Sequence, residues 1–139
     1  MTKYKRLMVI VVLIIGFVLI GGHYPSSLLT QELNAVTKIT VVYHRNDNKT
    51  HELYLAKDND LMQRIYQLID STKVRVNPLP SANQEQTNDP QFTIIVEYEN
   101  GSKDTILATE TGEFLYRRLT GAGWAGGHNK EINTIVKNL

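Results

Sequence analysis

Residues 92–109 read FTIIVEYENGSKDTILAT, and this stretch decides the fold. Asn100-Gly101 separates two runs rich in β-branched and apolar residues, which is the strongest short-range signal for a β-hairpin. A two-residue turn there predicts that one face of the hairpin carries Phe92, Ile94, Val96, Tyr98, Thr105 and Leu107. Ile95 and Ile106 meet on the opposite face, so we expect a central hairpin that is partly covered on both sides.

A second hairpin is predicted upstream, from VTKITVVY at 36–43 and HELYLA at 51–56. Two lengths are possible for the loop that joins these two strands. A two-residue loop separates the apolar residues onto opposite faces, whereas a three-residue loop over Asp47 to Lys49 pairs Tyr43 with Leu53 and Val41 with Leu55. Because a slip of one residue turns every side chain to the other face, the three-residue loop is favoured.

Two amphipathic segments predict helices. In residues 58–71, apolar side chains recur at i, i+4, i+7 and i+8, and Asp58 is a suitable N-cap. The apolar residues of this stripe are Leu61, Ile65, Leu68 and Ile69. Residues 129–139 form the second helix, which Asn129 caps and whose apolar face carries Ile132, Ile135, Val136 and Leu139.

The remaining segments predict short strands at 73–76 and 112–119, a long proline-containing loop at 77–91 and a glycine-rich turn region at 121–127. Hairpins with helices set apart from them are typical of α+β proteins. We therefore expect an antiparallel sheet of about five to six strands, with two helices packed on it and an N-terminal transmembrane helix before it.

The N-terminal segment has fourteen residues without a polar side chain, LMVIVVLIIGFVLI at 7–20, preceded by Lys3, Lys5 and Arg6. This pattern predicts a basic cytoplasmic tail at 1–6, a transmembrane anchor or a cleaved signal peptide at 7–24, a stalk at 25–35 and an extracytoplasmic domain at 36–139. A retained single-pass anchor in the cell membrane is favoured, with the domain outside the cell. Cleavage would make the protein secreted.

Charge and cysteine content exclude several classes of function and of site. The 139 residues carry a formal net charge of +1, and three of the cations lie in the basic tail. The remaining chain is slightly acidic, so no nucleic-acid partner is expected. The absence of Cys excludes disulfides, thiolate metal sites and a Cys nucleophile.

Motifs that could carry chemistry are weak. Residues 121–126 match G-x-G-x-x-G, but too little chain follows for a βαβ unit, so no dinucleotide cofactor is expected. The four His residues lack the spacing of metal ligands. Glu97 opposite Asp104 could bind a cation or perform acid–base chemistry, although a solvated sheet edge is more common. No catalytic, cofactor-binding or metal-ligating residue is predicted.

These observations favour a non-enzymatic binding or accessory module of the bacterial envelope, with an envelope protein as partner. The candidate contact residues are Trp124, Leu79 and Tyr116, because Trp124 could stand exposed on the glycine-rich tip and Leu79 lies in the long loop. A sensor for a small ligand or a cation, using the acidic hairpin, is the alternative. An envelope hydrolase is a third, weaker one.

The chain also resembles the YhfM-like small surface proteins of unknown function from Gram-positive bacteria. The resemblance rests on ITVVY at 39–43, DLMQRIYQLID at 60–70, FTIIVEYENGSKDTIL at 92–107 and GGHNKEINTIVKNL at 126–139. It covers about residues 36–139 and implies an α+β surface domain. It transfers no functional residue, and this chain has no Cys to accept the lipid that anchors some members.

Overall fold

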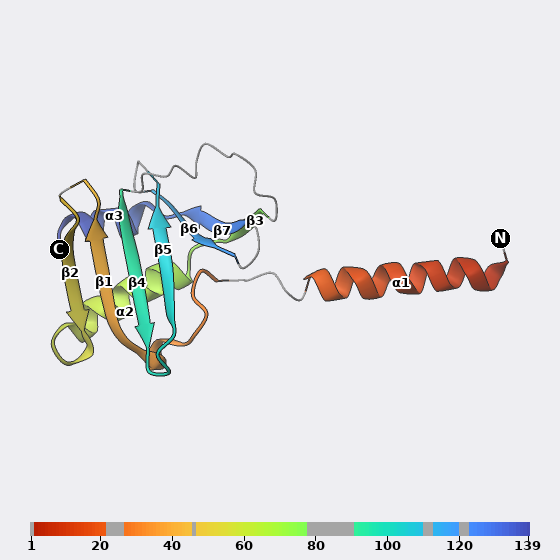
Figure 1. The fold of residues 1–139 in the computed structure, drawn as a ribbon, viewed down its shortest axis with the longest axis horizontal. Coiled ribbons are helices and arrows are strands. Elements are labelled where there is room, and N and C mark those ends of the chain that lie inside the picture. Colours follow the sequence, from red (N-terminus) through yellow and green to blue (C-terminus); the bar gives the residue numbers. More distant parts are fainter. Residues whose placement is uncertain (1, 22–26, 46, 78–90, 110–112, 120–122) are drawn as a thin grey trace.

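The structure is a computed structural model that describes residues 2–21, 27–45, 47–77, 91–109, 113–119 and 123–139 (Figure 1). It is an α+β fold in which one antiparallel sheet carries helices on one face, and helix α1 stands apart from the sheet. The helices are α1 (Lys3–Gly21), the 3₁₀ turn η1 (Leu33–Ala35), α2 (Leu55–Asp70) and α3 (Lys130–Lys137).

The sheet has seven strands in the order β2-β1-β4-β5-β6-β7-β3, where five to six were expected. The strands are β1 (Val36–Tyr43), β2 (Lys49–Tyr54), β3 (Arg75–Asn77), β4 (Phe92–Tyr98), β5 (Lys103–Ala108), β6 (Phe114–Arg118) and β7 (Trp124–His128). The additional strand is β7, which occupies the region predicted to be a glycine-rich turn. Strands β2 and β3 form the two edges.

The β4–β5 hairpin exists, but its register differs by one residue from the prediction. Glu97 pairs with Lys103, and Val96 pairs with Asp104. The loop has three residues instead of two, because Tyr98 N–H donates to Ser102 C=O and Gly101 adopts a φ of +83°. The slip exchanges the faces of β5: Ile106 and Ala108 join the core, while Thr105 and Leu107 lie on the other side.

The β1–β2 hairpin is also shifted. Tyr43 pairs with Lys49 and Ile39 pairs with Leu53, so the predicted three-residue loop is wrong. Asp47 and Asn48 both adopt positive φ values, 52° and 55°, within a longer turn. Since the shift is an even number of residues, Leu53 still shares the core face with Ile39.

Helix α3 lies where it was predicted, whereas α2 overlaps the predicted helix but begins earlier, at Leu55. Asp58, the predicted N-cap, has a non-helical backbone conformation inside α2. Its carboxylate accepts a hydrogen bond from Tyr54 N–H at 3.2 Å. Asn129 caps α3, as predicted, by accepting a hydrogen bond from Ile132 N–H at 3.1 Å. The buried residues of α2 are Met62, Ile65, Tyr66 and Ile69.

The main core lies between the sheet and these two helices. It includes Leu28 and Leu29, which are 0% and 7% exposed, so this part of the predicted stalk packs on the domain. The backbone of β7 also lies close to the backbone of Lys73. A Cβ on Gly127 would lie 2.2 Å from the carbonyl oxygen of Lys73, so only glycine fits there.

The opposite face of the sheet carries a second, smaller cluster. Phe114 lies edge-on to Trp124, with ring centroids 5.4 Å apart, and edge-on to His128 at 5.0 Å. Tyr116 and Trp124 are 2% and 6% exposed. Three aromatic side chains therefore form a local core on the face that α2 and α3 do not cover.

The N-terminal segment is helical, but it does not fit the predicted transmembrane anchor. Among the described residues, no helix combines the length and the apolar character needed to cross a membrane. This finding corrects the predicted transmembrane helix and the predicted single-pass location in the cell membrane. The part of the predicted anchor at 22–24 lies outside the described residues.

Candidate functional site

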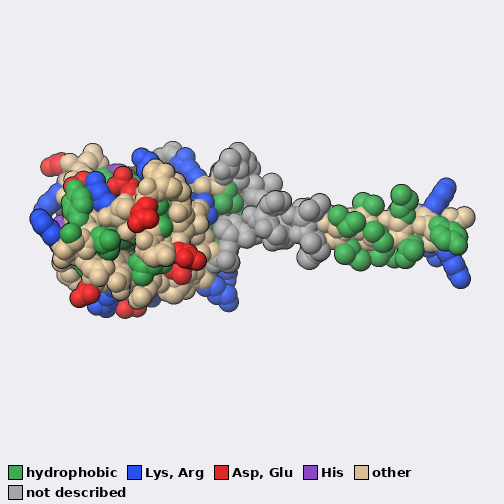
Figure 2. Space-filling view, turned by 90° about the horizontal axis from the view of Figure 1, so that it is seen from below, with side chains coloured by type: hydrophobic (Ala, Val, Ile, Leu, Met, Phe, Trp, Pro, Cys, Tyr) green, Lys and Arg blue, Asp and Glu red, His purple; other side chains and the backbone are tan. Residues whose placement is uncertain are grey.

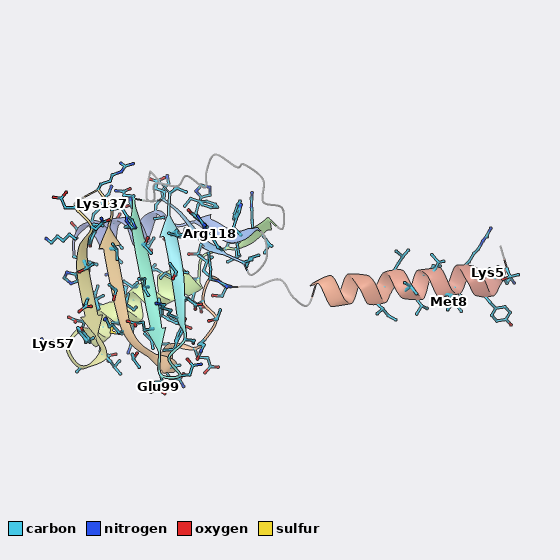
Figure 3. All side chains as sticks on the ribbon, in the orientation of Figure 1. Lys5, Met8, Lys57, Glu99, Arg118 and Lys137 are labelled. Carbon is cyan, nitrogen blue, oxygen red and sulfur yellow. The ribbon has the colours of Figure 1, made fainter. Side chains whose placement is uncertain are left out.

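A groove lies at the end of the sheet where α2 begins. We call it the α2 groove; it encloses about 370 Å³ and is lined by Leu33, Asn34, Val36, Leu55, Asn59, Met62 and Gln63. Lys57 and Glu99, labelled in Figure 3, mark this end of the sheet. Figure 2 views the molecule from this end, where hydrophobic side chains appear at the surface of the body.

At this end of the sheet, β1 extends beyond the last residue of its antiparallel neighbour β2. The pairing of β1 with β2 starts at Lys38 and Tyr54, although β1 itself starts at Val36. After Tyr54 the chain leaves the sheet and enters α2 at Leu55. The groove is bounded by residues 33–36 on one side and by residues 55–63 of α2 on the other.

Apolar side chains form the floor and one rim of the groove. Val36 and Met62 are 2% and 1% exposed and belong to the main core, whereas Leu55 is 53% exposed. In the described part of the folded body, Tyr54 and Leu55 are the large hydrophobic residues that are exposed. An exposed leucine beside an apolar floor forms a surface whose burial by a ligand is favourable.

The polar side chains of the groove are three carboxamides, from Asn34, Asn59 and Gln63, and no charged side chain of the described residues lines it. Gln63 Nε2 donates to Asn59 Oδ1 at 3.1 Å across one turn of α2. A carboxamide has two N–H donors and an oxygen acceptor, so the three side chains retain capacity to bond a ligand.

A cluster of charged side chains lies on the helix-free face of the sheet, where β1 pairs with β2 and β4. Lys38 Nζ lies 2.9 Å from Glu52 Oε1 and 3.6 Å from Glu97 Oε2. The Tyr54 hydroxyl donates to Glu52 Oε2 at 2.6 Å. Hydrogen bonds from Tyr54 and Lys38 lower the pKa of Glu52. This cluster therefore joins one cation to two carboxylates and keeps a net negative charge.

The residues predicted to contact a partner are not arranged as expected. Trp124 was expected on an exposed tip, but it is a buried residue of β7 and packs against Phe114. Tyr116 is buried in the same cluster. Leu79 lies outside the described residues. The structure thus brings Tyr116 and Trp124 together without exposing either side chain.

The acidic hairpin does not bring Glu97 and Asp104 together. Glu97 lies beside Lys38 on the helix-free face, whereas Asp104 points into the core side and is 4% exposed. Thr30 N–H donates to Asp104 Oδ2 at 2.7 Å, and the Tyr98 hydroxyl donates to the same oxygen at 2.5 Å. Within the described ranges, no cluster of three or more His, Asp or Glu residues could hold a metal ion.

Sequence reasoning missed the α2 groove. It assigned Leu55 to a strand and to the core, whereas Leu55 is the first residue of α2 and is largely exposed. The predicted N-cap at Asp58 was a usable signal, because it implies that β2 ends before this residue. The second wall, at residues 33–36, lies too far away in sequence to be associated with α2 without the fold.

Comparisons of the chain with protein-family models, with curated proteins and with solved structures give no match. The resemblance to YhfM-like surface proteins therefore stays a prediction.

Proposed function

We propose that this protein is a non-enzymatic binding module and that the α2 groove is its binding site. One observation carries the proposal: a hollow of about 370 Å³ has an apolar floor, an exposed leucine at its rim and, in the part of the chain that the structure describes, no charged lining residue. Its volume lies in the range of small-ligand sites, which are mostly apolar with a few polar groups.

The lining selects the chemistry of the bound group. An apolar group that covers Leu55 and the floor gains about 25 cal/mol for each Å² of apolar surface removed from water. A charged group would lose its hydration and find no opposite charge in the groove. The proposed ligand group is therefore apolar and uncharged.

The test is a titration of the full-length, ¹⁵N-labelled protein, followed by two-dimensional amide NMR spectra. The probe is 4-methyl-1-pentanol, and the control is 4-methylpentanoate, which has the same branched chain and a carboxylate. We expect the alcohol to shift the side-chain amide signals of Asn34, Asn59 and Gln63. The carboxylate is expected to leave them unchanged.

A pair of variants on α2 locates the binding. Gln63→Trp fills the groove, whereas Gln67→Trp places the same side chain one turn further along, at an exposed position outside it. We expect the first variant to abolish the shifts and the second to retain them. Equal shifts with both probes, or shifts that survive in Gln63→Trp, would contradict the proposal.

A further inference from the structure

We propose that a second pocket, between β2 and the end of α3, binds the phosphate group of a phosphate monoester. We call it the β2–α3 pocket; it encloses about 190 Å³ and is lined by Tyr43, Lys49, His51, Lys137 and Leu139. Figure 3 labels Lys137 at the end of the sheet away from Lys57 and Glu99, which mark the α2 groove. The pocket is therefore a separate site, and this proposal does not rest on the proposed function.

Two elements that are far apart in sequence bring cationic side chains to this pocket. Lys49 and His51 are alternate residues of β2, so their side chains share one face of the sheet. It is the face that the helices cover, because Leu53, the next alternate residue, lies in the main core. The last turn of α3 adds Lys137 from the other side of the pocket.

Tyr43 fixes the end of α3 beside the strands. It lies directly opposite Lys49 in the register of β1 and β2. Its hydroxyl donates to the carbonyl oxygen of Val136 at 2.6 Å, which joins the last strand residue of β1 to the last turn of α3. The walls of the pocket are thus held in place by the fold, which lowers the cost of ordering them around a ligand.

The two lysines of the pocket have no anionic partner within the described part of the chain. Neither Lys49 nor Lys137 forms an ion pair there, whereas Lys38 and Arg64 both do. None of the lining side chains is acidic. The dipole of α3 accounts for a cation in its last turn. It does not account for Lys49, which belongs to a strand, so an anion shared by the two ammonium groups explains their convergence.

The kind of cation selects phosphate over a carboxylate. An ammonium group is a compact point charge with three N–H donors, and a histidine ring adds a further donor. Such donors can approach the oxygens of a tetrahedral anion from several directions. Planar carboxylates are matched best by the paired N–H groups of Arg, and no Arg of the described residues lines the pocket. A phosphate monoester carries a charge of about −1.5 to −2 at neutral pH, which two lysines complement.

The test is a titration of the full-length, ¹⁵N-labelled protein at constant ionic strength, followed by two-dimensional amide NMR spectra. The probe is methyl phosphate, and the control is methyl sulfate, which has the same shape and a smaller negative charge. We expect methyl phosphate to shift the amide signals of His51 and Lys137. It should bind about tenfold more tightly than methyl sulfate, because the additional charge faces two cations.

Single charge removals locate the binding. Lys49→Gln and Lys137→Gln each remove one cation from the pocket, and Lys130→Gln removes the same charge from the first residue of α3, outside it. All three side chains are exposed, so the variants should fold. We expect each pocket variant to weaken methyl phosphate binding about threefold to tenfold, as loss of one charge-assisted contact implies. The control should bind as the native protein does.

Phosphate monoesters occur on soluble molecules and on lipid headgroups, and a second assay separates these sources. Vesicles of phosphatidylcholine, with and without phosphatidic acid, are sedimented with the native protein and with the three variants. Binding that requires phosphatidic acid and is lost in Lys49→Gln and Lys137→Gln, but not in Lys130→Gln, supports the pocket with a lipid source. Binding of methyl phosphate without this vesicle effect supports it with a soluble source.

Three results would overturn the proposal. They are equal affinities for methyl phosphate and methyl sulfate, affinity that survives in both pocket variants, and an equal loss in Lys130→Gln. None of them bears on the α2 groove, whose titration with 4-methyl-1-pentanol reports other residues. Failure of the phosphate site and failure of the proposed function are therefore distinguishable.

Discussion

Asp104 shows how one residue fixes the start of the folded body. Its buried carboxylate accepts hydrogen bonds from the backbone N–H of Thr30 at 2.7 Å and from the Thr30 hydroxyl at 2.9 Å. The Tyr98 hydroxyl adds a third donor. A carboxylate with several donors can be buried at acceptable cost, and here it ties the segment before η1 to the β4–β5 hairpin.

Replacing this carboxylate should weaken the fold. Asp104→Asn turns one acceptor oxygen into a donor that faces donors, so we expect the free energy of unfolding to fall by about 2–3 kcal/mol. Urea denaturation measures the change. Lys103→Gln, at the exposed neighbouring position, is the control and should have little effect. Equal stability of the two variants would show that the Asp104 contacts contribute little.

Tyr98 predicts a loss of stability in alkaline solution. Burial, and then its hydrogen bond to Asp104, raise the pKa of this phenol well above its ordinary value of 10.0. Because the pKa is raised in the folded state, the stabilisation is complete below the unfolded pKa and is lost as the pH rises above about 10.

The phenylalanine variant isolates this contribution. Tyr98→Phe should be less stable than the native protein at neutral pH, because Asp104 loses a donor. Its free energy of unfolding should also decline less steeply above pH 10. Urea denaturation at a series of pH values measures both, and parallel pH profiles for the two proteins would contradict the assignment.

At the scale of elements, β7 depends on glycine for space and the β4–β5 turn depends on it for conformation. A Cβ at Gly127 would lie 2.2 Å from Lys73 O and 2.9 Å from Thr72 Cγ2. Gly101 has open space around it, but its φ is +83°. Gly127→Ala should therefore cost about 3 kcal/mol by overpacking, and Gly101→Ala about 1–2 kcal/mol by strain. Thermal or urea unfolding of both variants measures the two losses of stability. A smaller loss in Gly127→Ala than in Gly101→Ala would contradict this prediction.

The elements also show what the sequence could predict. Periodicity located α2 and α3, and the Asn-Gly pair located the β4–β5 hairpin. The register failed because loops of two and three residues both place Gly101 at a positive φ. Here Asn100 Oδ1 accepts from Ser102 N–H at 2.9 Å, which stabilises the longer loop. Strand β7 was missed because its glycines indicated a turn, whereas they are needed for close contact with neighbouring backbone and rings.

At the scale of the whole molecule, residues before β1 belong to the folded body. Leu28 is 0% exposed in the main core, whereas Leu55 is 53% exposed at the groove. We expect Leu28→Ala to lower the free energy of unfolding by about 3 kcal/mol. Leu55→Ala should change it by less than about 0.5 kcal/mol, although it should weaken binding in the groove. Similar losses of stability in the two variants would contradict this assignment.

The α2 groove could not be predicted because its two walls, residues 33–36 and 55–63, meet only once β1 and α2 have packed. Sequence reasoning selected Trp124 and Tyr116 by residue type, and the fold placed both inside a local core. Aromatic residues are common in interfaces and in cores, and only the register of β6 and β7 decides between these locations.

The strand order also has a consequence for how the chain is made. Strand β3 leaves the ribosome before β4, yet its partner is β7, with Arg75 opposite Gly126. The hairpin of β1 and β2 and helix α2 can assemble early from neighbouring segments. One edge of the sheet has to wait for residues 124–126, so a nascent chain that stops short of them holds β3 without its partner strand. Closure of this edge is therefore a late event in biosynthesis, and the glycines of β7 are the residues that make it fit.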